Sequence, residues 1–207
     1  NLDNGPSREA IVIPEHELIR RVASGSYGEV WLARCPLGSF RAVKIVRRSA
    51  FEYAKPFDRE YNGICRFEPV SRKHPAVIDI LQVGRDDAAG YFYYVMELAD
   101  GLAAGPETDA EGYTPRTLRA DLYERAPLPL SECLALGRTM ADAIGHLHRN
   151  GLVHRDVNPS NIIYVDGQPK LADPGCVDSA TRTGTLTGTL GYIPREGFGK
   201  PSGDLYA

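Results

Sequence analysis

The eight residues 154–161, His-Arg-Asp-Val-Asn-Pro-Ser-Asn, lie between a helical pattern and a short apolar run at 162–165. A polar loop fixed between a helix and a strand can present side chains at a site while its ends are held by the scaffold. The loop carries a carboxylate at Asp156 and an amide five residues later, at Asn161, and a second acid, Asp173, follows. One acid to accept a proton, with an acid and an amide to hold a metal ion, is a set of groups that phosphoryl transfer uses.

The composition excludes several classes of protein. The 207 residues suffice for one large domain or two small lobes, and 43% hydrophobic with 25% charged residues is ordinary for a soluble globular chain. A net charge of −3 gives no indication of a nucleic-acid partner. The longest apolar run, near 91–99, is shorter than the roughly 20 residues of a membrane span, and no signal peptide is visible. We therefore expect a cytoplasmic chain, and its first and last residues suggest a fragment whose sensor or membrane segments could lie outside it.

The cysteines and histidines do not form a standard metal-binding pattern. The four cysteines are widely spaced and include no Cys-x-x-Cys pair, which argues against a zinc cluster or a disulfide framework and favours a reducing compartment. His146, His148 and His154 flank the polar loop at a spacing that is not a standard ligand set. We expect them to be hydrogen-bonded scaffold.

The N-terminal part of the chain predicts a glycine-rich hairpin. Residues 1–14 are polar and contain Pro and Gly, so we expect a poorly ordered lead-in. Strands are expected at 18–22 and 28–34, and between them Gly25 and Gly28 would let backbone N–H groups approach a phosphate closely. Glycine-rich hairpins are also common where no ligand binds, so these residues alone leave both interpretations open.

Lys44 is a lone cation in the next predicted strand, at 40–46. An unpaired charge in an apolar strand is costly, so the lysine needs a partner. A helix follows, with Pro56 suited to its first turn, and Glu60 lies on or beside its inward face. A Lys44–Glu60 pair would orient the ammonium toward phosphates, and the alternative is a lysine that reaches the surface and a solvated glutamate.

The second half of the chain alternates between short strands and helices. The Gly-, Ala- and Pro-rich segment between the two halves predicts a linker or surface insertion and the best domain boundary. The Thr- and Gly-rich stretch near the C-terminus has no apolar period and predicts a mobile loop. In order, the expected elements are strands at 76–83 and 91–98, the insertion at 100–115, a helix from Leu118, a helix capped by Ser131 and closed by Asn150 and Gly151, a strand at 162–165, and the mobile loop at 179–189.

In their order and spacing these motifs resemble the eukaryotic-type protein kinase family, and most closely its bacterial serine/threonine members. The series comprises the hairpin, Ala-Val-Lys, the helix glutamate, a strand ending Met-Glu, His-Arg-Asp with Asn five later, Asp-Pro-Gly, and Gly-Thr-x-Gly-Tyr. The resemblance spans roughly 18–207 and implies an α+β, two-lobed fold. Residues 15–99 would form a small antiparallel β lobe with one helix, and 100–207 an incomplete, mainly helical lobe with an activation segment at 173–196.

The resemblance implies ATP and Mg²⁺ or Mn²⁺ as cofactors and a protein serine or threonine hydroxyl as acceptor. Asp156 would be the base or would orient the acceptor, Lys44 would contact phosphates while held by Glu60, and Asn161 and Asp173 would bind the metal. Met96 would be the gatekeeper. The residues implied to contact ATP are Val22, Ala23, Ser24, Gly25, Ser26, Tyr27, Gly28, Glu29, Val30, Ala42, Lys44, Met96, Glu97, Ala99 and Ile163.

The resemblance also implies regulation by the Thr-rich loop. Arg155 would hold that loop once it is phosphorylated, by charge-assisted hydrogen bonds, and autophosphorylation is possible there. Thr189 lies in the segment that resembles the peptide-facing loop and would contact the protein substrate, which argues against a small-molecule acceptor. The composition of the loop also fits an unmodified flexible segment. The candidate phosphorylation sites are Thr181, Thr183, Thr185 and Thr187.

Four residues depart from the family pattern, Ala23, Asn158, Pro174 and Arg195, and the second and third bear most on activity. Asn158 stands where the family usually has a lysine, and loss of one such donor can cost about 10²–10³ in rate. Pro174 replaces the phenylalanine of Asp-Phe-Gly, so it is expected to bias Asp173 toward an extended backbone and supplies no ring between Ile64 and His154. Two interpretations stay open: an ATP-dependent protein serine/threonine kinase, and a pseudokinase that acts as a nucleotide-binding or scaffolding module.

Overall fold

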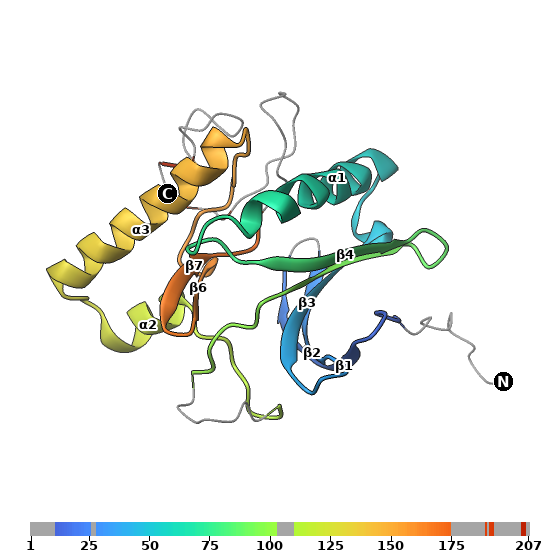
Figure 1. Ribbon diagram of the computed structural model, residues 1–207, viewed down its shortest axis with the longest axis horizontal. Helices are drawn as coiled ribbons and strands as arrows, with labels where there is room; N and C mark the ends of the chain where they lie inside the picture. The colour runs from blue at the N-terminus through green and yellow to red at the C-terminus, as the bar shows by residue number, and fades with distance from the viewer. Residues whose placement is uncertain are drawn as a thin grey trace.

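A five-stranded antiparallel sheet forms the first part of the fold, and α1 lies along it (Figure 1). The structure is a computed structural model that describes residues 11–25, 28–102, 110–174, 189, 191–192 and 204–205. The sheet order is β1-β2-β3-β5-β4, and β6 and β7 form a separate hairpin. The strands are β1 Glu17–Ser24, β2 Gly28–Arg34, β3 Phe40–Arg47, β4 Ile80–Asp86, β5 Tyr91–Met96, β6 Ile162–Val165 and β7 Gln168–Leu171, and the α-helices are α1 Ala54–Ser71, α2 Leu118–Arg125 and α3 Leu130–Arg149.

This arrangement confirms the expected α+β fold, although several elements begin or end at residues other than those expected, with the clearest differences at β4 and α3. β4 begins at Ile80, because the residues before it pair with β7 instead: Ile78 N donates to Leu171 O at 3.0 Å, and Leu171 N donates to Ala76 O at 2.8 Å. The predicted N-cap at Ser131 is wrong. The N-cap is Pro129, two residues earlier, so α3 starts at Leu130, and the carbonyl of Pro129 accepts the first helical N–H groups.

The described part of the predicted lead-in is ordered. Tyr91 Oη donates to the carbonyl oxygen of Val12 at 2.8 Å, and the side chain of Ile13 is only 3% exposed. Ile13 packs with Val43 and Tyr93 in a small second core on the face of the sheet that points away from α1. The expectation of a poorly ordered lead-in is therefore wrong for residues 11–13, whereas residues 1–10 lie outside the described ones.

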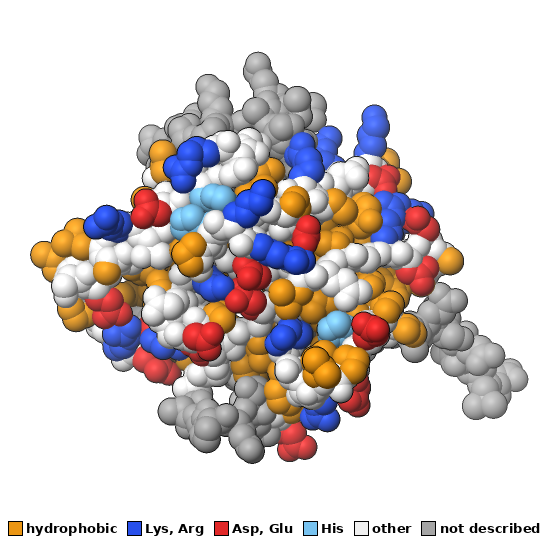
Figure 2. All heavy atoms as spheres, in the orientation of Figure 1, with side chains coloured by type: hydrophobic (Ala, Val, Ile, Leu, Met, Phe, Trp, Pro, Cys, Tyr) orange, Lys and Arg blue, Asp and Glu red, His pale blue; other side chains and the backbone are white. Residues whose placement is uncertain are grey.

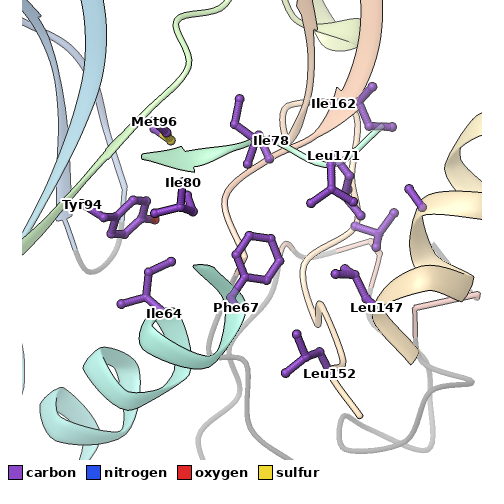
Figure 3. Close-up of a cluster of buried hydrophobic side chains, with 14 of the residues drawn as sticks. Ile64, Phe67, Ile78, Ile80, Tyr94, Met96, Leu147, Leu152, Ile162 and Leu171 are labelled. Carbon is purple, nitrogen blue, oxygen red and sulfur yellow. The ribbon is translucent and has the colours of Figure 1, made fainter. Parts of the chain in front are cut away.

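One hydrophobic cluster runs from the sheet through α1 to α3 and the β6–β7 hairpin. Phe67 of α1 is fully buried within it. Figure 3 shows its ring between Ile64 on one side and Leu171 and Leu147 on the other. Because buried apolar area is the main favourable term in folding, this cluster helps to hold α1 to the second part of the chain as well as to the sheet.

The surface agrees with the near-neutral composition. Figure 2 shows acidic and basic side chains interspersed over the face that carries α1 and α3. Hydrophobic side chains gather at the first turns of α3, where Leu130 is 74% and Leu134 is 65% exposed. Of the helices in the described parts of the chain, none is long and apolar enough to cross a membrane.

The central position of Phe67 predicts a large loss of stability for Phe67→Ala. Removal of a fully buried aromatic ring leaves a cavity, and we expect the free energy of unfolding in urea to fall by about 3–5 kcal/mol. Tyr123→Ala is the matched control, because that ring is 92% exposed, and its effect should stay within about 0.5 kcal/mol. Equal effects of the two substitutions would contradict this description of the core.

Candidate active site

An ion pair joins the sheet to the segment that follows β7; the lysine is largely buried, whereas the aspartate side chain is 38% exposed. Lys44 Nζ donates to Asp173 Oδ1, and Tyr94 Oη donates to the same oxygen at 3.3 Å. Lys44 lies in β3 and its side chain is 12% exposed. We expected Glu60 as its partner, but the described hydrogen bond goes to Asp173, and Glu60, itself buried on α1, acts on the lysine through its charge.

Each member of this pair keeps the other charged. Burial would lower the pKa of Lys44, but the carboxylate of Asp173, with smaller contributions from Tyr94 and Glu60, raises it well above its usual value. Burial would likewise raise the pKa of Asp173, but the ammonium of Lys44 and its hydrogen bond lower it. An ammonium and a carboxylate therefore face each other at neutral pH.

Asp173 reaches the lysine with a left-handed backbone, at φ 55°. The expectation that Pro174 would keep Asp173 extended is therefore wrong. Aspartate is among the non-glycine residues that adopt positive φ most readily. The ion pair and the Tyr94 hydrogen bond offset the cost of that conformation, and a backbone turned in this way aims the carboxylate back at β3.

The polar loop holds the carboxylate of Asp156 with donors on both oxygens. Oδ1 accepts from Thr189 N at 3.0 Å, from Thr189 Oγ1 at 2.8 Å and from Asn158 Nδ2 at 3.0 Å. Oδ2 accepts from Asn161 Nδ2 at 2.8 Å. The structure thus brings together four of the predicted site residues, and Asp156 has a fixed orientation.

Asn158 is a buried cross-link within this loop, with 4% of its surface exposed. Its Nδ2 also donates to Thr189 Oγ1 at 3.1 Å, and its Oδ1 accepts from Ser160 N at 2.8 Å. The amide therefore positions Asp156 and Thr189 relative to each other, although it supplies no positive charge.

Asn161 and Asp173 are brought close by the backbone, since Ala172 N donates to Asn161 O at 2.8 Å. Among the described residues, Asn161 Oδ1 and Asp173 Oδ2 receive no hydrogen bond. An amide and a carboxylate oxygen fit Mg²⁺, which commonly takes one or two carboxylates together with phosphate and water oxygens. The described residues include no group of three or more His, Cys, Asp or Glu suited to a metal ion.

The register of the sheet gathers several of the residues predicted to contact ATP. Val30 pairs with Lys44 across β2 and β3, and Ala42 pairs with Met96 across β3 and β5. Lys44 and Ala42 are two residues apart and so point to the same face of the sheet. Ile163 lies partly buried on β6.

After Met96 the chain leaves the sheet, and only some of its backbone N–H and C=O groups make hydrogen bonds within the described residues. Glu97 N donates to Asp79 O at 3.3 Å, and Ala99 O accepts from Tyr113 Oη at 2.9 Å. Within the described residues, Glu97 O and Ala99 N make no hydrogen bond. The side chain of Glu97 points away toward Lys170, whose Nζ lies 2.7 Å from Oε2.

The histidines confirm the scaffold prediction, and Asp204 links two of them. Asp204 is 2% exposed and accepts from His148 Nε2 at 2.9 Å, from His154 N at 2.7 Å and from Arg155 N at 2.7 Å. His154 Nε2 donates to Ala172 O at 3.1 Å, so its ring connects the loop to the residue before Asp173. Burial lowers the pKa of His154, although nearby carboxylates oppose the shift.

Three residues at or beside the site were missed from the sequence, namely Tyr94, Tyr113 and Asp204. Tyr94 belongs to an aromatic run that we interpreted only as a buried strand; its place two residues before Met96, on the same face, was the available signal. Tyr113 lies in the segment expected to be an insertion, and no pattern singled it out. The predicted residues that lie outside the described ones are Ser26, Tyr27, Thr181, Thr183, Thr185 and Thr187.

Comparisons with known proteins found similar sequences. The protein kinase domain profile matches residues 16–203. The chain is 30% identical over 191 residues to a probable serine/threonine-protein kinase of Clostridium perfringens, with 87% of the chain and 25% of that protein covered. It is 29% identical over 206 residues to the serine/threonine-protein kinase PrkC of Bacillus subtilis, covering 93% of the chain and 28% of PrkC. It is 35% identical over 172 residues to the serine/threonine-protein kinase PknL of Mycobacterium tuberculosis, covering 74% and 39%. The chain thus spans about a quarter to two fifths of the length of these relatives.

Because His154 is buried in its neutral form, we predict that the free energy of unfolding falls in mild acid. Its pKa is lowered in the folded chain, so the unfolded chain binds a proton more readily, and stability falls as pH drops below about 6.5. His74, whose pKa burial also lowers, adds to the effect with the same sign. Urea unfolding between pH 7.5 and 5.5 checks this, and His154→Asn should have a shallower pH dependence than wild type. An unchanged slope in that variant would contradict the assignment.

Proposed function

Because the chain belongs to the protein kinase domain family, we propose that it transfers the γ-phosphoryl group of ATP to a serine or threonine hydroxyl of a protein. The observation that carries the proposal is the convergence of two groups of residues on one place. Lys44 and Asp173 form a partly buried ion pair, and Asp156 is held by Asn161, whose backbone is bonded to the residue before Asp173. Phosphoryl transfer depends mostly on positioning and on neutralisation of charge, and these residues supply both.

The backbone after β5 supports binding of adenine. Among the described residues, the carbonyl of Glu97 and the N–H of Ala99 carry no hydrogen bond. One acceptor and one donor, two residues apart, complement the amino group and ring nitrogen on the edge of an adenine. Ala42 and Met96, paired across neighbouring strands, would then face the base from the sheet.

The contacts support the individual roles that the family resemblance implies. Lys44 would bind α- and β-phosphate oxygens, and Asp173 holds its ammonium in the direction of the site. Asn161 and Asp173 would hold Mg²⁺, which when bound neutralises phosphate oxygens. Asp156, fixed by Asn158 and Asn161, would orient the acceptor hydroxyl and accept its proton.

A pseudokinase is the second candidate, and one observation favours it. The buried amide of Asn158 occupies the position beside Asp156 where a cation would stabilise the transferring group.

Autophosphorylation on the Thr-rich loop remains a prediction. The thiols of Cys35, Cys65 and Cys133 are free, which fits a reducing compartment, and we propose the cytoplasm.

The direct experiment is incubation of the chain with γ-labelled Mg·ATP and a generic protein acceptor such as casein or myelin basic protein. We expect label on serine or threonine. Asp156→Asn should reduce the rate by about 10²–10⁴, because it removes the base while leaving a group that can still hydrogen-bond. Asp166→Asn is the matched control, since Asp166 is exposed at positive φ, which asparagine tolerates, and its rate should not change. Nucleotide binding without any transfer would favour the pseudokinase instead.

Asn158→Lys distinguishes the two candidates further. An ammonium at this position can donate to Asp156 and Thr189 as the amide does, and it adds the missing charge. If charge limits the reaction, the rate of transfer should rise by up to about 10². Asn158→Ala is the companion variant and should lower the rate, because Asp156 and Thr189 lose their cross-link. A rate in Asn158→Ala equal to that of wild type would show that the amide positions nothing.

A further inference from the structure

Arg20 of β1 reaches across to the segment 110–117, which we name the hinge strap. Its Nε donates to Ala110 O at 2.7 Å, and its Nη2 donates to Tyr113 O. A planar guanidinium that binds two carbonyl groups at once gives a directional contact, which a lysine could not reproduce. The contact spans about 90 residues of sequence and joins the strand before the glycine-rich hairpin to the other half of the chain.

The same strap is bonded to the hinge, the extended chain after β5. Tyr113 is 5% exposed, and its hydroxyl donates to Ala99 O at 2.9 Å. Leu102 N donates to Thr114 O at 2.9 Å, so the strap doubles back along the residues that follow Ala99. A buried hydroxyl that binds a buried carbonyl is costly to separate, because both groups would lose their partner.

The far end of the strap is fixed to β6. Arg116 N donates to Asp100 O at 2.7 Å, and Tyr164 N donates to Arg116 O at 3.2 Å. The guanidinium of Arg116 also lies 4.2 Å from the centre of the Tyr164 ring. The strap is thus anchored in the second half of the chain, in contact with the hinge, and held to β1 by the side chain of Arg20.

We propose that Arg20 and Tyr113 form a latch that limits how far β1 and the hairpin after it can lift from the hinge. Arg20 is two residues before Val22, where the predicted phosphate-covering hairpin begins, and Tyr113 binds the carbonyl of a predicted adenine contact. Opening the site would break the Arg20 hydrogen bonds, so the latch slows release of the nucleotide. Its role in release rests on the proposed function, and lid opening is often the step that limits turnover.

The latch is tested first without nucleotide, by amide hydrogen exchange on the 207-residue chain. Arg20→Met should increase exchange in both 17–24 and 110–117 by about tenfold, because loss of two charge-assisted hydrogen bonds frees both segments. Arg21→Met is the matched control: Arg21 is the next residue, exposed, and bound only to Glu29 at 3.2 Å among the described residues. It should leave exchange in 110–117 unchanged. Arg20→Lys keeps the charge but cannot bind two carbonyl groups with a planar guanidinium. It should therefore increase exchange in 17–24 and 110–117, by less than Arg20→Met does.

Release of a fluorescent methylanthraniloyl-ADP with Mg²⁺ is the second measurement. Arg20→Met and Tyr113→Phe should each speed release by about fivefold or more, and the double variant should be no faster than the faster single one, because both act on the same strap. Unchanged exchange in Arg20→Met with nucleotide binding intact, or fully additive effects on release, would overturn the latch. A wild-type chain that binds no Mg·ADP would instead overturn the proposed function and the role of the latch in release.

Discussion

The interaction on which the site depends is the ion pair between Lys44 and Asp173, which is buried on the lysine side. A lysine inside a β-strand is unfavourable unless its charge is compensated, and this lysine is compensated by a residue 129 positions away. The pair therefore forms only when the segment after β7 is held at one position beside the sheet. Because Tyr94 donates to the same carboxylate oxygen, β3 and β5 both contribute to that requirement.

Contacts around the ion pair hold the two segments in these positions. The chain before β4 pairs with Leu171 at the end of β7, so the sheet and the β6–β7 hairpin meet directly before Asp173. Phe67 fills the space behind them in the shared core (Figure 3). The polar loop is then fixed from two sides, by Asn161 O to Ala172 N and by Asp204 to the backbone at His154. Precise placement of catalytic groups needs this kind of support from neighbouring elements.

The elements that carry the proposed site could be predicted from the sequence because they depend on local patterns, whereas the roles of its residues came from the family resemblance. The strand around Lys44, the helix with Phe67 and the loop around Asp156 all follow from periodicity and composition. Contacts between residues far apart in the sequence could not be predicted in this way. Asp173 as the hydrogen-bond partner of Lys44, its positive φ before a proline, and the path of the strap through Tyr113 are decided by tertiary contacts that no local pattern encodes. Asn158 shows the same limit: its type indicated a missing charge, whereas its position as a buried cross-link emerged only from the fold.

The most direct test of the pair is a double-mutant cycle on the free energy of unfolding. Wild type is compared with Lys44→Met, with Asp173→Asn, which tolerates positive φ, and with the double variant. The account predicts that each single variant leaves a charge or amide without its partner, so the double variant should be more stable than the sum of the single effects implies. With solvent screening allowed for, the coupling should be about 1–2 kcal/mol. Strictly additive effects would contradict the claim that this ion pair joins the two halves of the site.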